Sequence, residues 1–262
     1  MKFKLTLSTI FLLGTIIILN AQSYPPDGWR VEIDITSRNG DQKSADICAV
    51  QNTIHVIYCD NWNDPTRSRF CLYYKKSEDF GFNWTESISL SLPEENVVAE
   101  ANCNKITALG EEVYVLYTVK DNYGERYFLK FIKSTNGGTS WSELLTIYGA
   151  SPWRTENDIV VSNDSIRIIF TTGWDVCYGA SGLSGTSWCI STIPIQTPNV
   201  PFMSPSIALR NNHPRCVFGG GWGPSTLYYA KFDNNQWQVS QIDGDPLSIL
   251  RACIALEGVT CT

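Results

Sequence analysis

A tryptophan recurs along this chain at a spacing of roughly 50 residues, which lies within the range typical of repeat architectures. Each of these tryptophans opens a short segment in which apolar and polar residues alternate. Alternation with a period of two is typical of β-strands. The recurring residues are Trp29, Trp84, Trp141, Trp188 and Trp237. The sequence therefore predicts an all-β protein built from repeats.

The residues before the tryptophans repeat as well, in the order Ser, acid or amide, Gly. A carboxylate or amide accepts N–H bonds within a tight turn, Gly supplies a positive φ, and Trp packs beneath the turn. The third copy has Leu183 where the acid stands, and residues 232–237 form only a turn before the last tryptophan. The predicted structural residues are Ser77, Asp79, Gly81 and Trp84, then Ser134, Asn136, Gly138 and Trp141, then Ser181, Gly185 and Trp188.

This SxDxGxxW pattern resembles the Asp-box, or BNR repeat, of the sialidase-like β-propeller superfamily. The resemblance implies four-stranded antiparallel blades, with the Asp-box turn joining the third and fourth strands. Further alternating segments upstream of each turn fit four strands per repeat. We expect blades at about 44–92, 101–149, 156–196 and 204–243.

The two ends of residues 22–262 suggest parts of a further blade. Residues 28–37 look like a fourth strand with no blade before them, and residues 248–262 look like the first strands of another blade. An open sheet edge exposes unpaired N–H and C=O groups, which propellers avoid by closing. The expected fold is thus an incomplete propeller, four blades plus parts of a further one, and the chain is expected to be a fragment.

The N-terminus has the pattern of an export signal. Lys2 and Lys4 precede an apolar run over residues 5–19, and Ala21 supplies a small residue at the expected cleavage position. The alternative is a membrane anchor, for which the run is short. We therefore predict a signal peptide at 1–21 and a secreted, periplasmic or cell-surface protein without a membrane span after cleavage.

The cysteine count fits an oxidising compartment, since the chain has 9 Cys. An odd number leaves at least one thiol unpaired within the chain. Three pairs have spacings that suit neighbouring strands, but the pairing stays open: Cys59 with Cys71, Cys177 with Cys189, and Cys253 with Cys261.

Composition excludes several classes of partner. A net charge of −6 argues against nucleic acid, which requires basic stripes. The two histidines, His55 and His213, and the lack of a CxxC motif argue against a metal site. Nothing in the sequence implies a cofactor.

The expected ligand site follows from blade geometry. The loops between second and third strands share one face with the links between blades, and the resemblance implies that this face holds the substrate. The loops carry a recurrent aromatic residue and acids, which suit stacking on sugar rings and hydrogen bonds to hydroxyls. The candidate residues are Trp62, Tyr123, Trp174, Trp222, Asp60, Asp121 and Asp175, with Trp153 and Arg154 from the link 153–156 and further lining from 201–203. The alternative is that these rings only fill contacts between blades.

Catalytic residues cannot be assigned from the resemblance. Sialidases use an arginine triad, a Tyr–Glu nucleophile pair and an acid/base Asp. The chain has no Arg-Ile-Pro motif, and Arg67, Arg126, Arg154 and Arg251 are only candidates to face the opening. The leading hypothesis is an extracellular binding or scaffold module for a glycan or a protein. The alternatives are an exo-sialidase-type hydrolase completed by further C-terminal blades and a purely structural repeat.

Overall fold

The computed structural model describes residues 34–36, 39–100, 102–121, 123–195, 202–220, 226–243 and 253–255. The chain divides into two compact units, Met1–Ser37 and Arg38–Thr262, and every strand belongs to the second. The predicted signal peptide, Trp29 and Trp222 lie outside the described residues. Within the described ranges, no helix has the length and apolar character of a membrane span.

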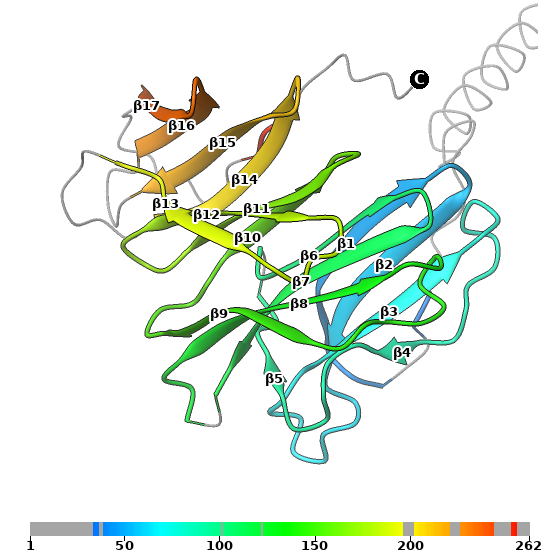
Figure 1. Cartoon of the computed structure of the whole chain (residues 1–262). Helices are drawn as coiled ribbons and strands as arrows, with labels where there is room; N and C mark the ends of the chain where they lie inside the picture. The colour runs from blue at the N-terminus through cyan, green and yellow to red at the C-terminus, as the bar shows by residue number, and fades with distance from the viewer. Residues whose placement is uncertain are drawn as a thin grey trace, which may run out of the picture. The chain divides into compact units, whose positions relative to one another are not determined.

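Four antiparallel sheets follow one another along the chain, and we call them blades one to four (Figure 1). Blade one contains β1 (Gln42–Val50), β2 (Thr53–Asp60), β3 (Cys71–Ser77) and β4 (Ile88–Ser89). Blade two contains β6 (Asn104–Leu109), β7 (Glu112–Lys120), β8 (Tyr127–Ser134) and β9 (Leu145–Ser151), and the short β5 (Asn96–Val97) also pairs with β7.

Blades three and four repeat this order. Blade three contains β10 (Asn157–Val161), β11 (Ser165–Thr171), β12 (Val176–Gly182) and β13 (Cys189–Thr192). Blade four contains β14 (Phe202–Arg210), β15 (His213–Gly220), β16 (Thr226–Asp233) and β17 (Gln236–Asp243).

The predicted all-β class with four-stranded antiparallel blades is confirmed. The expected fourth strand after Trp84 is reduced to the two residues of β4, and β5 was not expected. Of the expected further blade, only residues 34–36 and 253–255 are described.

The first strands of successive blades lie side by side, β1 against β6, β6 against β10 and β10 against β14. Carboxylates on these strands join them. Asp46 Oδ2 accepts a hydrogen bond of 2.9 Å from the Ile106 N–H, and Asp158 Oδ2 accepts one of 2.9 Å from the Ile207 N–H. Burial raises the pKa of both carboxyl groups. The same pattern continues weakly beyond blade four, where the Ile254 N–H donates to Ser206 Oγ at 3.3 Å.

Apolar cores fill the spaces between adjacent blades, and each core contains the same aromatic contact. A ring from the third strand of one blade meets the repeated tryptophan of the next blade edge to face. The three pairs are Tyr74 with Trp141 at 4.9 Å between centroids, Phe131 with Trp188 at 5.3 Å, and Tyr178 with Trp237 at 5.1 Å.

The turns between third and fourth strands are closed by their own side chains. In blade one, Ser77 Oγ accepts the Gly81 N–H at 2.8 Å and donates to Asp79, whose Oδ1 accepts the Asn83 N–H at 2.8 Å. Ser134, Asn136 and Gly138 make the same bonds in blade two. In blade three, where Leu183 replaces the acid, the buried Ser181 hydroxyl has no partner in the part of the chain that is described.

In blades two and three, the glycine of the turn admits the aromatic ring of the preceding blade. Gly138 has a φ of 77°, and a Cβ at this position would lie 1.9 Å from Tyr74 Oη. Gly185 has a φ of 68°, and its Cβ would lie 2.4 Å from the ring of Phe131. Glycine is therefore required at each of these positions for two reasons, the positive φ and the close approach of the neighbouring blade.

Substitution of three glycines separates these two requirements. We expect Gly138→Ala to lower the free energy of unfolding by about 3 kcal/mol, because it combines left-handed strain with overpacking against Tyr74. Gly110→Ala carries the strain alone, since nothing lies within 4 Å of its Cβ position and φ is 58°, and should cost about 1 kcal/mol. Gly182→Ala meets no atom within 4 Å at a φ outside the left-handed region and should be nearly neutral. Urea unfolding measures all three, and equal losses for Gly138 and Gly110 would contradict the interlock.

Tyr74, whose ring contacts Trp141, also forms a hydrogen bond with His55, and this histidine predicts a pH dependence of stability. His55 is 1% exposed, and its Nδ1 lies 2.7 Å from Tyr74 Oη. Burial, with the nearby Lys76, lowers the pKa of His55 from 6.5 to about 4. Between these values the unfolded chain binds a proton that the folded chain excludes, so stability falls as the pH falls through this window. We expect the urea midpoint to drop more between pH 7 and pH 4.5 in the wild type than in His55→Gln. An equal drop in the two proteins would show that groups other than His55 cause the pH dependence of stability.

Candidate functional site

One face of the blades carries the loops between second and third strands together with the links from blade to blade, and we call it the link face. It includes loops 61–70, 121–126 and 172–175 and links 90–103, 152–156 and 193–201, of which residues 101, 122 and 196–201 are not described. The opposite face, which we call the turn face, carries the turns between third and fourth strands. The candidate ligand residues that the structure describes belong to the link face.

Two tryptophans of the link face contact each other. Trp153, in the link to blade three, and Trp174, in the β11–β12 loop, lie 6.1 Å apart between ring centroids at an interplanar angle of 89°. They are 40% and 47% exposed. Gly173 permits this approach, because its φ is 92° and a Cβ there would lie 2.5 Å from the Trp153 ring. The turn at Gly173 therefore allows the two exposed indoles of Trp153 and Trp174 to meet, and we call this pair the aromatic corner.

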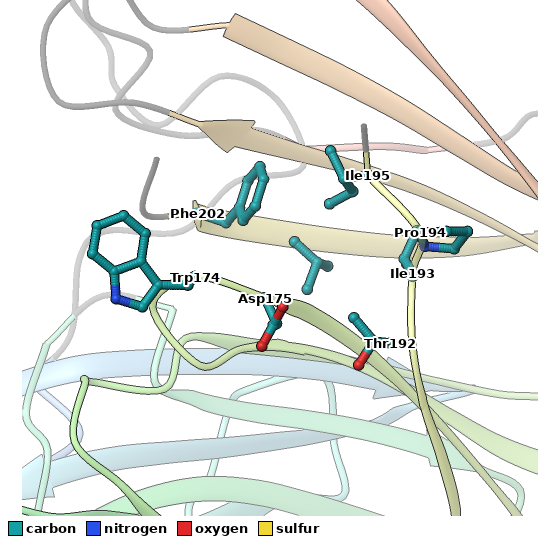
Figure 2. A pocket seen from close by; sticks show the side chains of 8 residues that line it. Trp174, Asp175, Thr192, Ile193, Pro194, Ile195 and Phe202 are labelled. Carbon is teal, nitrogen blue, oxygen red and sulfur yellow. The ribbon is translucent and has the colours of Figure 1, made fainter. Parts of the chain in front are cut away.

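A pocket of about 340 Å³ lies next to this corner (Figure 2). A backbone hydrogen bond of 2.7 Å from the Phe202 N–H to the Gly173 carbonyl ties the start of β14 to the β11–β12 loop beside it. Aromatic and aliphatic side chains dominate the lining, and Asp175 and Thr192 add polar groups. The lining residues are Trp174, Asp175, Val176, Thr192, Ile193, Pro194, Ile195 and Phe202. A hollow in which an exposed aromatic ring lies beside polar groups can bind a small molecule.

An ion-pair cluster adjoins Trp153. One terminal nitrogen of Arg154 donates a hydrogen bond to Glu100, and the other donates one to Glu156. The Glu156 side chain is 7% exposed, and its second oxygen accepts the Ser204 N–H at 2.6 Å. The Glu100 side chain is 57% exposed. The cluster thus joins the links before β6 and β10 to the first strand of blade four.

Irregular backbone at the starts of the first strands positions these groups. Ser204 has a φ of 50° and lies in a bulge of β14, which directs its N–H to Glu156. Ser44, in the matching bulge of β1, has a φ of 50° and donates to the Glu100 carbonyl at 2.6 Å. Asn102 has a φ of 63°, and its Nδ2 lies 3.3 Å from Ser204 Oγ. Such conformations are uncommon for non-glycine residues and tend to occur at functional sites.

The structure distributes the candidate ligand residues unevenly. Trp153, Arg154, Trp174 and Asp175 come together, whereas Trp62 and Tyr123 are 47% and 88% exposed on the loops of blades one and two. Asp60 is 1% exposed, and its two oxygens accept hydrogen bonds from the Trp62 N–H and the Gln42 side chain. Asp121 accepts the Glu125 N–H within its own turn. Trp222 lies outside the described residues.

Sequence reasoning missed Glu100, Ser204 and the apolar segment 193–195. Glu100 lies in a link without a repeated motif, and Ser204 is polar in a strand that reads as an ordinary first strand. No local pattern distinguishes them, because their role depends on partners 54 and 48 residues away.

A Tyr–Glu pair does occur, but its surroundings do not suit a nucleophile. Tyr117 donates to Glu95 Oε2 at 3.1 Å and is 0% exposed. Burial raises the pKa of Tyr117, and the carboxylate of Glu95 raises it further, so the phenol keeps its proton. The pair stabilises the core between blades one and two.

The described cysteines are all unbonded, and Cys261 is not described. Cys59 and Cys71 lie on the adjacent strands β2 and β3, one register position apart. The described ranges contain no cluster of three or more His, Cys, Asp or Glu suited to a metal ion.

No protein-family description and no curated protein match the chain. Solved structures do. An α-L-arabinofuranosidase of family GH93 from Fusarium graminearum in complex with arabinobiose superposes with a TM-score of 0.61 at 15% identity, over 81% of this chain and 70% of that one. An α-L-arabinanase from Penicillium chrysogenum, also with arabinobiose, gives a TM-score of 0.56 at 12% identity, over 76% and 66% of the two chains.

The NanB sialidase from Streptococcus pneumoniae, as its K499G mutant, gives a TM-score of 0.59 at 12% identity, over 83% of this chain and 54% of that one. The chain therefore spans between 54% and 70% of the length of these three structures. The expected architecture is confirmed, and the chain has the sialidase-like β-propeller fold.

Proposed function

We propose that this sialidase-like propeller is a secreted carbohydrate-binding module whose glycan occupies the link face at blades three and four. The observation that carries the proposal is the pocket beside the Trp153–Trp174 corner. Exposed indole faces stack on the C–H surfaces of sugars, and the Asp175 carboxylate and Thr192 hydroxyl can bond to sugar hydroxyls.

Two further considerations support a carbohydrate. Structures with the same fold include an arabinofuranosidase and an arabinanase, both with arabinobiose, and a sialidase. The turns closed by Ser77 and Asp79 and by Ser134 and Asn136 make the bonds that the Asp-box pattern requires, and we assign them to Asp-boxes. Export by a signal peptide at 1–21 would bring the site to extracellular glycans.

Removal of the aromatic corner tests binding. Trp174→Ala should weaken binding to the best ligand on a glycan array by at least about tenfold, because a truncated aromatic anchor loses stacking and apolar contact. Isothermal titration with that ligand measures the loss.

Phe82→Ala is the matched control, since Phe82 is an aromatic residue that is 53% exposed on the turn face. It should bind like the wild type. Equal affinities of Trp174→Ala and Phe82→Ala would rule out the corner as the binding site. Retention of an extracellular protein, with no glycan bound, would favour a protein partner instead.

Glycoside hydrolysis is the second candidate, favoured by the two carboxylates of the ion-pair cluster at Arg154. Glu156 is buried, Glu100 is exposed, and paired carboxylates of unequal environment can divide acid and base roles. Further blades beyond the present chain would complete such a site.

An activity assay decides between binding alone and hydrolysis. If the chain hydrolyses 4-nitrophenyl α-L-arabinofuranoside or a fluorogenic sialoside, Glu156→Gln should lower kcat by about 10²–10⁴-fold, the usual loss for an acid or base. Unchanged kcat in Glu156→Gln would exclude this residue from catalysis. A complete protein that binds sugars but releases no leaving group would exclude hydrolysis.

A further inference from the structure

We propose that this site selects neutral sugars over acidic ones, because Arg154, which follows Trp153 of the aromatic corner in the chain, is already neutralised by two carboxylates. The proposal rests on the carbohydrate binding proposed above and names the class of sugar bound there.

Both terminal nitrogens of the Arg154 guanidinium are already engaged in ion pairs. A sugar carboxylate is usually held by two parallel N–H bonds from one guanidinium. Here the two terminal nitrogens of Arg154 donate to Glu100 on one side and Glu156 on the other. A sugar carboxylate would have to share the guanidinium with these two carboxylates or displace one of them.

Displacement of Glu156 is unfavourable. Its side chain is 7% exposed, and its second oxygen is held by the Ser204 N–H. If Arg154 turned to a ligand, Glu156 would remain as a buried charge without its cation, and such a loss is costly. Ser204 lies in a bulge of β14, and movement of Glu156 with the arginine would break its hydrogen bond to the Ser204 N–H.

The net charge of the site also disfavours the binding of acidic sugars. One guanidinium and two carboxylates leave the cluster with a net negative charge, and Asp175 adds another at the pocket. The other arginines of the described link-face loops, Arg67, Arg69 and Arg126, stand on blades one and two, whereas blades three and four line the pocket. A sugar carboxylate would therefore meet like charge.

Neutral sugars fit the same groups well. The oxygens of the exposed Glu100 and of Asp175 accept hydrogen bonds from hydroxyls, and the corner formed by Trp153 and Trp174 offers an apolar surface to a sugar ring. Glu100 is thus a specificity-determining residue, because it is the exposed member of the cluster and the one whose charge can be removed with least disturbance.

A matched pair of ligands tests the selection. The probes are digalacturonate and its dimethyl ester, which differ in charge and share their rings, together with arabinobiose as a neutral reference. The wild type should bind the ester at least about tenfold more tightly than the acid, as expected when like charges are brought together. Binding of the acid alone should strengthen as salt is raised, because salt screens the repulsion.

Two glutamate variants complete the test. Glu100→Gln should reduce the preference for the ester at least about fivefold, by removing one negative charge and freeing one side of the guanidinium. Glu86→Gln, which removes an exposed carboxylate from the turn face, should leave the preference unchanged.

The outcomes separate the two proposals. Tighter binding of the acid than of the ester, or an unchanged preference in Glu100→Gln, would overturn the selection and leave carbohydrate binding intact. Failure of the folded wild type to bind any of the three sugars, or anything on the glycan array, would overturn carbohydrate binding itself.

Discussion

The insertion of an aromatic ring from one blade beneath the turn of the next is the contact on which the rest of the structure depends. The ring meets the tryptophan of the next blade three times, through Tyr74, Phe131 and Tyr178, and the first two rings also lie against the turn glycines Gly138 and Gly185. Each ring requires a glycine or a short turn above it and a tryptophan beside it, so one contact accounts for two of the repeated residues. Because each core is shared by two blades, a blade cannot bury its apolar face alone.

This coupling also sets the geometry of the link face. The first strands are joined by Asp46 and Asp158, whose carboxylates accept N–H groups of the following blade. Their starts are then held together by side chains such as Ser44 and Asn102. Links from blades that are distant in sequence thereby meet at fixed positions, and the cluster around Arg154 is assembled from three blades.

The same fold occurs in an arabinofuranosidase and in a sialidase, so the fold alone does not decide the ligand. What distinguishes the present site is the state of its arginine. A guanidinium held by two carboxylates organises the surface without presenting a positive charge, while the indoles beside it remain available for stacking. Residue type alone does not decide function either. Tyr117 and Glu95 have the residue types of a sialidase nucleophile pair, but Tyr117 is buried in a core, where the pair has a structural role.

The sequence by itself determined the repeat, the β class, the positions of the turns and the face on which the loops gather, because these follow from patterns within a few residues of one another. It also predicted that Trp153, Arg154, Trp174 and Asp175 lie on that face, since loops between second and third strands and links between blades can be read from strand order. Only the tertiary structure decided that Asp60 closes its own turn, that Trp153 contacts Trp174, and that Glu100 and Glu156 share Arg154. The physical reason is that ion pairing and ring contact depend on distances in space between residues far apart in the chain, which the packing of one blade against the next fixes.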